Sequence, residues 1–195
     1  QNLSHDDGYT YEMYVSGDYY LEDFLKQGGA TNDAELIQFV TDHITKGLIP
    51  MTIKSKEIAC SSFTAWTEDN KFVFGRNYDF DQTNTAIVHT SPKGRHASIS
   101  TIDLQFLGIK EESGISSIKE KALLLAAPYI PLDGINDAGV ACGIYMTYQG
   151  EPTTPTNQNT DKPNITSTTL LRLILDYADS VDEAIELASK YDMHD

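Results

Sequence analysis

Basic residues are scarce in this sequence, which has 14 lysines and arginines against 29 aspartates and glutamates and a formal net charge of −15. A surface with this charge repels the phosphate backbone of nucleic acids and anionic lipid headgroups. Long apolar runs are also lacking, since none approaches the roughly 20 residues that span a bilayer. We therefore expect neither nucleic-acid binding nor a membrane span.

Cysteine is rare as well, because Cys60 and Cys142 are the two cysteines of the chain. This number excludes a disulfide-rich scaffold but leaves two interpretations open. The two residues could form one disulfide in an oxidising compartment, or one could be a reactive thiol and the other a core residue. Neither lies at a metal-ligand interval from a second cysteine or a histidine, so we expect no metal site and no cofactor.

Histidine offers no evident catalytic partner for a thiol. The histidines are His5, His43, His89, His96 and His194. None stands in a spacing from Cys60 that is typical of a Cys–His dyad. A catalytic role for Cys60 would need a base from elsewhere.

The composition is typical of one globular domain, with 40% hydrophobic and 22% charged residues in a chain of 195. The chain opens at Gln1 without a methionine and continues with a polar stretch rich in tyrosine. This start is typical of a mature form whose signal peptide or tag has been removed. We expect a secreted, periplasmic or cell-surface location.

Helical spacing first appears after residue 32. Asn32 followed by Glu35 is a capping-box pattern, and apolar residues then repeat at helical intervals, which predicts an amphipathic helix over 33–47. Gly47 favours the end of this helix. Residues 51–58 are expected to form an extended lead.

Alternating and short apolar patterns predict strands through the middle of the chain. The segments predicted as strands are 60–67, 71–79, 85–90, 97–106, 122–127 and 140–147. Residues 150–166, rich in Pro, Thr and Asn, are expected to form an exposed, mobile loop. A helix is predicted at 168–178, and Ser180 with Glu183 is expected to cap another.

The first two of these strands form a predicted hairpin that brings a thiol and a carboxylate together. The polar turn between them is centred between Asp69 and Asn70. With that centre, Cys60 lies opposite Asp79 in the strand pair.

Arg76 is the cation nearest to this pair along the strand. A guanidinium close to Cys60 would favour the reactive thiolate. Strand alternation, however, directs the Arg76 side chain to the face opposite Cys60. We therefore expect the strand to bend or end at Gly75, because glycine is the residue that most readily permits this.

These residues resemble a known family. The stretch 60–63, with the sequence Cys-Ser-Ser-Phe, and the stretch 74–79, with the sequence Phe-Gly-Arg-Asn-Tyr-Asp, are similar to motifs of the choloylglycine hydrolases, also called linear amide C-N hydrolases. Residues 133–140, Asp-Gly-Ile-Asn-Asp-Ala-Gly-Val, are similar to the turn and strand of the same family. The family includes bile salt hydrolases, penicillin V acylases and, more distantly, acid ceramidase and N-acylethanolamine acid amidase.

The resemblance implies an α+β fold, the αββα sandwich of antiparallel sheets found in N-terminal-nucleophile hydrolases. The predicted strands are too few for both sheets, so we expect the sandwich to be incomplete in this chain. Residues 1–59 would be a leader or propeptide-like segment with one helix, and residues 60–195 the N-terminal portion of the catalytic domain.

By the same resemblance, Cys60 becomes the N-terminal residue through self-cleavage between Ala59 and Cys60. Its thiolate attacks the amide carbonyl, Asp79 holds the freed amino group, and Arg76 stabilises the thiolate and positions the substrate. A physical argument agrees, because an α-amine with a pKa near 8 is partly neutral at working pH and lies on the residue that it activates.

The resemblance and the loop composition together predict the substrate-binding residues. These are Phe80, Tyr129, Asn136, Tyr145 and Met146. Most are apolar or aromatic, which favours an apolar acyl group such as a bile acid, a fatty acyl chain or phenoxyacetyl. Met146 stands where bile salt hydrolases have an asparagine, and this departure weakens the prediction of bile-salt specificity.

Partners are expected to include a small-molecule amide, a C-terminal remainder of the same catalytic domain, and a second copy of the chain in a homo-oligomer. The family resemblance implies that the C-terminal remainder supplies an oxyanion-hole asparagine and a second arginine. Two alternatives to an active enzyme stay open. One is an inactive secreted binding module with a Cys60–Cys142 disulfide, and the other is an unprocessed zymogen.

Overall fold

The computed structural model describes residues 10–47, 59–80, 83–109, 115–146 and 160–194. The strands are β1 (Tyr11–Val15), β2 (Ala59–Trp66), β3 (Phe72–Asp79), β4 (Thr85–Thr90), β5 (Ser98–Asp103), β6 (Asp133–Asn136), β7 (Ala141–Gly143), β8 (Asn164–Ile165) and β9 (Asp192–Met193). The helices are α1 (Leu21–Lys26), α2 (Asp33–Val40), α3 (Ile118–Leu123), α4 (Ser167–Tyr177) and α5 (Val181–Ala188), with the π-helical turn η1 (Thr41–Thr45) and the 3₁₀ helices η2 (Leu104–Leu107) and η4 (Leu124–Tyr129).

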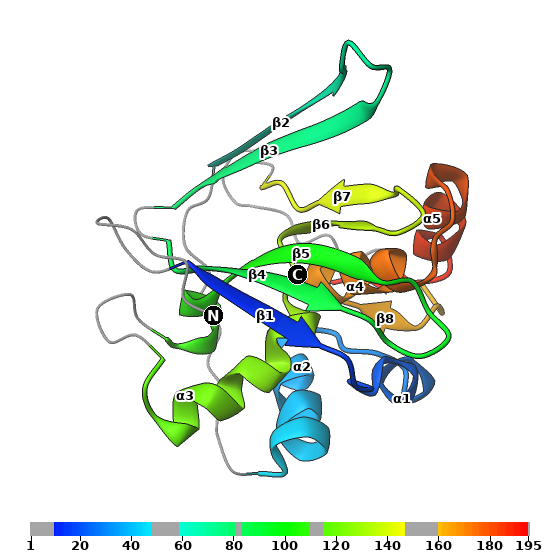
Figure 1. Cartoon of the computed structure of the whole chain (residues 1–195). Helices are drawn as coiled ribbons and strands as arrows, with labels where there is room; N and C mark the ends of the chain where they lie inside the picture. Colours follow the sequence, from blue (N-terminus) through cyan, green and yellow to red (C-terminus); the bar gives the residue numbers. More distant parts are fainter. Residues whose placement is uncertain (1–9, 48–58, 81–82, 110–114, 147–159, 195) are drawn as a thin grey trace.

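A five-stranded sheet in the order β1-β4-β5-β6-β7 forms the centre of the molecule (Figure 1). The strands from β4 to β7 are antiparallel to their neighbours. The hairpin β2–β3 is a separate two-stranded sheet, and Figure 1 shows it standing beyond β7. A short parallel pair, β8 and β9, lies near the C-terminus. This mixture of helices and mainly antiparallel sheets confirms the predicted α+β class.

The strand β1 was absent from the sequence prediction. It runs parallel to β4, with Tyr11 facing Ala86 and Val15 facing Thr90, so the sheet is mixed and not purely antiparallel. Tyr11, Met13 and Val15 share the side of β1 that packs on the core, and Tyr11 is buried there. The segment before Cys60 therefore contributes an edge strand to the central sheet.

The two faces of this sheet differ in what covers them. Ala86, Val88 and Ile102 are fully buried and point toward the side on which η4 and α4 pack. We call this side the helix face. Ile99 and Ile135 point to the other side and are largely exposed, and we call that side the open face.

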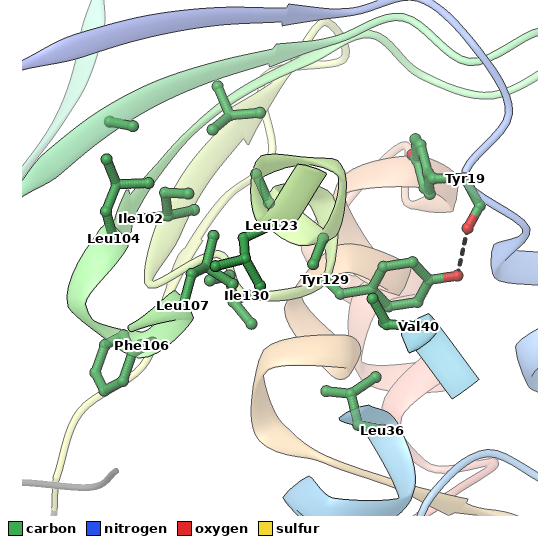
Figure 2. Packing of buried hydrophobic residues seen from close by; sticks show 14 of the residues in the cluster. Tyr19, Leu36, Val40, Ile102, Leu104, Phe106, Leu107, Leu123, Tyr129 and Ile130 are labelled. Atoms are coloured by element: carbon green, nitrogen blue, oxygen red, sulfur yellow. Dashed lines mark hydrogen bonds between the residues drawn. The ribbon is translucent and has the colours of Figure 1, made fainter. Parts of the chain in front are cut away.

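The hydrophobic core lies between the helix face and the helices. Leu36, Val40 and Tyr129 bring α2 and η4 together there (Figure 2). Phe24 of α1 belongs to the same cluster. The Tyr129 hydroxyl donates a hydrogen bond to the carbonyl oxygen of Tyr19, which satisfies the polar end of this buried ring. The N-terminal segment is thus part of the core.

The strand predicted at 122–127 is wrong. The segment is helical, with α3 followed directly by η4. Ser117 accepts a hydrogen bond from the Glu120 backbone amide and the Glu120 carboxylate accepts one from the Ser117 amide, so a complete capping box starts the helix. Alanine and leucine are strong helix formers, and a short buried apolar run fits a helix as well as a strand.

The helix predicted at 33–47 is a regular α-helix only over α2, which ends at Val40. Asn32 caps α2 by accepting a hydrogen bond from the Glu35 amide at 3.0 Å, as expected. The α-helix then widens into η1, and the chain leaves it through Lys46 and Gly47, both with positive φ. Residues 51–58 lie outside the described part of the chain.

Three further boundaries differ from the prediction. β5 ends at Asp103 instead of continuing to residue 106, because the Asp103 side chain accepts from the Gln105 amide and starts η2. β7 covers three residues of the predicted 140–147. Most of the loop predicted at 150–166 lies outside the described residues, but Asn164 and Ile165 form β8.

The C-terminal helices agree closely with the prediction. α4 occupies 167–177, and Ser180 accepts a hydrogen bond from the Glu183 amide at 3.2 Å to cap α5. No helix among the described residues combines the length and apolar character needed to cross a membrane.

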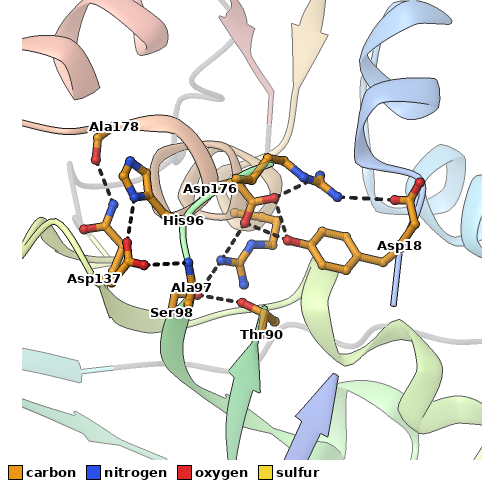
Figure 3. A network of polar contacts seen from close by, with 12 residues as sticks. Asp18, Thr90, His96, Ala97, Ser98, Asp137, Asp176 and Ala178 are labelled. Atoms are coloured by element: carbon orange, nitrogen blue, oxygen red, sulfur yellow. Dashed lines mark hydrogen bonds and ion pairs between the residues drawn. The ribbon is translucent and has the colours of Figure 1, made fainter. Parts of the chain in front are cut away.

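A buried polar network ties the N-terminal segment to α4 (Figure 3). The Asp176 carboxylate accepts from the Tyr19 hydroxyl at 2.6 Å, from Arg172 at 2.9 Å and from Arg95 at 3.0 Å. Arg172 also donates to Ser98 at 2.6 Å. Burial raises the pKa of Tyr19, so its phenol stays protonated and remains a donor.

We expect Tyr19→Phe to lower the free energy of unfolding by about 1–3 kcal/mol, because it removes a donor from a buried carboxylate. Thermal and urea unfolding measure the change. Tyr20→Phe is the matched control, since the neighbouring Tyr20 is partly exposed and should lose little. Equal losses in the two variants would contradict the importance of the Tyr19–Asp176 contact.

Candidate functional site

The hairpin that carries Cys60 has a register one residue away from the predicted one. Cys60 faces Tyr78, and Asp79 faces Ala59. The turn explains the shift, because the Thr67 amide donates to the Lys71 carbonyl and Asn70 takes a positive φ of 58°. This is the longer turn with one left-handed residue, which centres the hairpin on Asp69 and not between two residues.

The corrected register reverses the expectation for Arg76. Arg76 faces Ser62, and both lie on the same side of the hairpin as Cys60. The side chain therefore reaches Cys60 without any break in the strand. A shift of one residue moves every side chain of a strand to the other face. The wrong turn centre therefore also predicted the wrong face for Arg76.

Gly75 consequently has a different role from the predicted one. β3 continues through it, and a Cβ at this position would lie 2.3 Å from the ring of Phe63, which faces it across the hairpin. The position has no side chain because the Phe63 ring occupies that space. The prediction of a strand break at Gly75 is wrong.

Arg76 contacts three other residues of the site. Its Nη2 atom lies 3.4 Å from the Cys60 Sγ and donates to the carbonyl oxygen of Ile144. Its Nη1 atom donates to the Asp133 carboxylate at 2.8 Å. The guanidinium thus joins the hairpin to β6 and to the end of β7, on the open face of the central sheet.

The surroundings of Arg76 exclude most water. The side chain is 4% exposed, and its guanidinium lies 5.3 Å from the ring centre of Tyr78 and 5.2 Å from that of Tyr145. Each of these two aromatic rings adds a cation–π attraction to the guanidinium and lowers the local dielectric constant around it. A positive charge held there, 3.4 Å from the Cys60 sulfur, is poorly screened by water.

Asp79 lies beside the predicted cleavage site and not opposite Cys60. It faces Ala59, the residue before the cysteine, and its carboxylate accepts a hydrogen bond from Asn77 at 2.7 Å. Ala59 and Cys60 are the first two residues of β2. The peptide bond between them therefore lies at the start of β2, and Asp79 is paired with the first of the two residues that it joins.

Three predicted substrate-binding residues lie just after β3 and β7. Tyr145 and Met146 are 39% and 44% exposed and follow β7, next to the carbonyl that binds Arg76. Phe80 follows β3 and packs edge-on against Tyr78 at 5.3 Å between ring centres.

Two other predicted substrate-binding residues are corrected by the structure. Tyr129 is fully buried in the core, with its hydroxyl bonded to Tyr19. Asn136 is also buried, and its side chain donates to the Ala178 carbonyl and accepts from the Val140 amide. Their polar groups are satisfied within the fold, so neither side chain is available to a substrate.

The second cysteine, Cys142, lies away from the contact between Cys60 and Arg76. Cys142 faces Gly134 in the β6–β7 pair, which points it to the helix face, whereas the Cys60–Arg76 contact lies on the open face. Both cysteines are free thiols. Burial raises the pKa of the Cys142 thiol to about 12. The structure therefore contradicts the disulfide of the alternative interpretation.

Asp133 and Thr101 are site residues that the sequence prediction missed. Asp133 pairs with Thr101 across β5 and β6, and the Thr101 hydroxyl donates to its carboxylate at 2.6 Å. Asp133 is the first residue of the stretch 133–140 that resembles the family motif, and this position was the signal that could have pointed to it.

The arrangement can support nucleophilic chemistry at sulfur. It combines a partly exposed thiol, a buried cation in contact with it and Asp79, which faces Ala59 in the strand pair. In the described parts of the chain, no group of three or more His, Cys, Asp or Glu residues could hold a metal ion.

We expect Cys60 to react with iodoacetamide at least roughly tenfold faster than Cys142 in the folded protein near neutral pH. Burial raises the pKa of Cys142 and keeps it a thiol, while Cys60 is partly exposed and lies beside the Arg76 guanidinium. Peptide mass spectrometry after timed labelling measures both rates. Cys142→Ser should leave the Cys60 rate unchanged, and labelling that requires a reductant would instead indicate a disulfide.

Comparison with known proteins identifies the family. A family model described as linear amide C-N hydrolases, choloylglycine hydrolase family, matches residues 60–194. No curated protein and no solved structure matches the chain. The matched region begins at Cys60 and contains Arg76, Asp79 and Asp133. The chain therefore belongs to the choloylglycine hydrolase family of linear amide C-N hydrolases.

Proposed function

We propose that the protein hydrolyses linear amides through Cys60 as an N-terminal nucleophile. Membership of the family supports amide hydrolysis, and the contact of 3.4 Å between Arg76 Nη2 and the Cys60 Sγ carries the assignment of the nucleophile. A buried guanidinium in contact with a partly exposed thiol is an arrangement that activates cysteine.

The base in this mechanism is the α-amine of Cys60 itself. The neutral amine accepts the thiol proton, and the thiolate attacks the carbonyl carbon of the amide. When the tetrahedral intermediate collapses, the carbon–nitrogen bond breaks and the ammonium returns its proton to the leaving amine. Water then attacks the thioester with the same amine as base, which releases the carboxylic acid and restores the thiol.

Arg76 supplies positive charge at the start of this sequence. Its guanidinium stabilises the thiolate before attack, and its low exposure keeps that charge poorly screened by water. A lysine would not reproduce the arrangement, because Arg76 directs separate N–H groups to Asp133, to Ile144 and to Cys60.

Asp79 holds the freed amine in this proposal. The amine belongs to the backbone of the strand, so a carboxylate on the face opposite the thiol can still approach it. Support comes from the register, in which Asp79 faces Ala59, and from the hydrogen bond of Asn77, which orients the carboxylate. An ammonium next to a carboxylate is stabilised in its charged form.

Self-cleavage between Ala59 and Cys60 creates the amine. The Cys60 thiol attacks the Ala59 carbonyl, the peptide bond shifts to a thioester, and water hydrolyses the thioester. Until this happens Cys60 has no α-amine, so activity depends on the cut. Before the cut the chain would be a zymogen.

The acyl side of the substrate is proposed to be apolar. Tyr145 and Met146 present partly exposed apolar surface next to Arg76. Phe80, after β3, is partly buried between Tyr78 and Phe106 and is proposed to line the same surface. Bile acid, fatty acyl and phenoxyacetyl groups share the required chemistry.

A further part of the catalytic domain is proposed to cover the open face. Tyr14, Ile99 and Ile135 leave apolar surface exposed there, around a groove of about 480 Å³. The aromatic residues Trp66 and Phe72 near the tip of the hairpin are exposed as well. The homo-oligomer and the location outside the cytoplasm stay predictions.

We expect Cys60→Ala to lower amide hydrolysis by the full-length protein at least a thousandfold, because it removes the nucleophile. The substrates to test are glycine- and taurine-conjugated bile acids, penicillin V, N-acyl amino acids and N-acylethanolamides, with products followed by mass spectrometry. Cys142→Ser is the matched control and should retain activity. Activity of Cys60→Ala above a tenth of the wild type would contradict the proposal.

We expect intact-mass analysis of the purified wild type to show a break between Ala59 and Cys60. Cys60→Ala should stay uncut, because the thiol that attacks the Ala59 carbonyl is missing. Activity should rise in proportion to the cut fraction during incubation. Turnover of amide substrate by protein in which Ala59 and Cys60 are still joined would refute the mechanism.

A further inference from the structure

We infer that Asp133, held by Thr101, is a positioning residue that aims the Arg76 guanidinium at the Cys60 thiol. The inference rests on the proposed role of Cys60 as nucleophile. It concerns a residue whose carboxylate is bound to Arg76 and Thr101 and which acts on the thiol through Arg76.

Two contacts define the direction of the guanidinium. Nη1 donates to Asp133 on β6 at 2.8 Å, and Nη2 donates to the Ile144 carbonyl after β7. The guanidinium is planar, so two anchors, one on β6 and one just after β7, determine its orientation. Nη2, the atom that shares the Ile144 contact, then lies 3.4 Å from the Cys60 Sγ.

Asp133 is itself held in place from the other side. Its Oδ1 accepts from the Thr101 hydroxyl at 2.6 Å, while its Oδ2 receives Arg76. Thr101 and Asp133 face each other in the β5–β6 pair, in the open face of the sheet. The carboxylate is therefore fixed by the rigid sheet and not by a loop, which suits a positioning role.

The ion pair between Arg76 and Asp133 is largely buried, so its loss would be costly. Arg76 is 4% exposed and Asp133 is 14% exposed. Within the described ranges, Asp133 is the carboxylate that lies within ion-pair distance of Arg76. A guanidinium buried without a carboxylate is costly, so loss of Asp133 would favour an Arg76 side chain turned away toward water.

The alternative is a purely structural ion pair that joins the hairpin to the sheet. The two roles predict different behaviour of the thiol. A positioning residue changes the charge that the Cys60 sulfur experiences, whereas a structural one changes only the stability of the hairpin contact.

The experiment measures the rate of Cys60 alkylation by iodoacetamide against pH in folded, full-length protein, with peptide mass spectrometry to separate Cys60 from Cys142. The variants are Asp133→Asn, Asp133→Ala and Thr101→Val. Asp182→Asn is the matched control, because Asp182 is an exposed carboxylate at the start of α5. Thermal unfolding and kcat/KM for the best amide substrate are measured on the same samples.

We expect Asp133→Ala to lower the alkylation rate near pH 7 roughly tenfold, with recovery at higher pH where the thiolate forms without help. The value of kcat/KM should fall about a hundredfold, as for a misplaced catalytic group. Asp133→Asn keeps the shape and should show the same direction, and Thr101→Val a smaller change. Asp133→Glu, which restores a carboxylate, should recover part of the rate.

An unchanged alkylation profile in folded Asp133→Asn would overturn the inference, and so would faster alkylation, because Asp133 would then oppose the thiolate. If Asp133→Ala fails to fold, Asp133→Asn and Thr101→Val still decide. The test is independent of hydrolysis. Amide turnover that survives in Cys60→Ala refutes the proposed function, whereas an alkylation profile insensitive to Asp133 refutes the positioning role alone.

Discussion

The ion pair between Arg76 and Asp133 is the contact on which the arrangement of the site depends. The hairpin β2–β3 forms no strand pair with the five-stranded sheet. Its polar ties to the sheet are made by Arg76 and by Tyr78, whose hydroxyl lies 2.8 Å from that of Thr85. A buried ion pair contributes little net stability, but it strongly favours one geometry when both partners are held. Here it determines where Cys60 stands relative to the sheet.

The second constraint is that the open face, which carries the candidate site, and the helix face, which carries the core, are separate. Alternation along β5 and β6 sends Thr101 and Asp133 to the open face and Ser100 and Gly134 to the helix face. The core can therefore be tightly packed on one side while charged groups gather on the other. Cys142, on the core side, has a pKa raised by burial and takes no part in the site.

The segment before Cys60 is more deeply integrated than a leader that is only attached. β1 adds an edge to the central sheet, and Tyr19 donates to Asp176 inside a buried network with two arginines. Cutting the chain before Cys60 would leave these contacts in place. The proposed self-cleavage therefore does not require the segment before Cys60 to dissociate. The division of the chain at residue 59 stays a prediction, and it concerns where the chain is cut and not where a separately packed unit ends.

Local signals in the sequence were sufficient for the α+β class, for the caps at Asn32 and Ser180, and, through family motifs, for the association of Cys60 with Arg76. These features depend on residues close in the chain or on short patterns, so the sequence alone determined them. The tertiary structure decided the rest. The turn geometry at Asn70 shifted the hairpin register by one residue, and parallel pairing with β4 made a strand of 11–15. Contacts between distant segments brought Asp133 to Arg76 and buried Tyr129, because such contacts depend on how whole elements pack and not on local spacing.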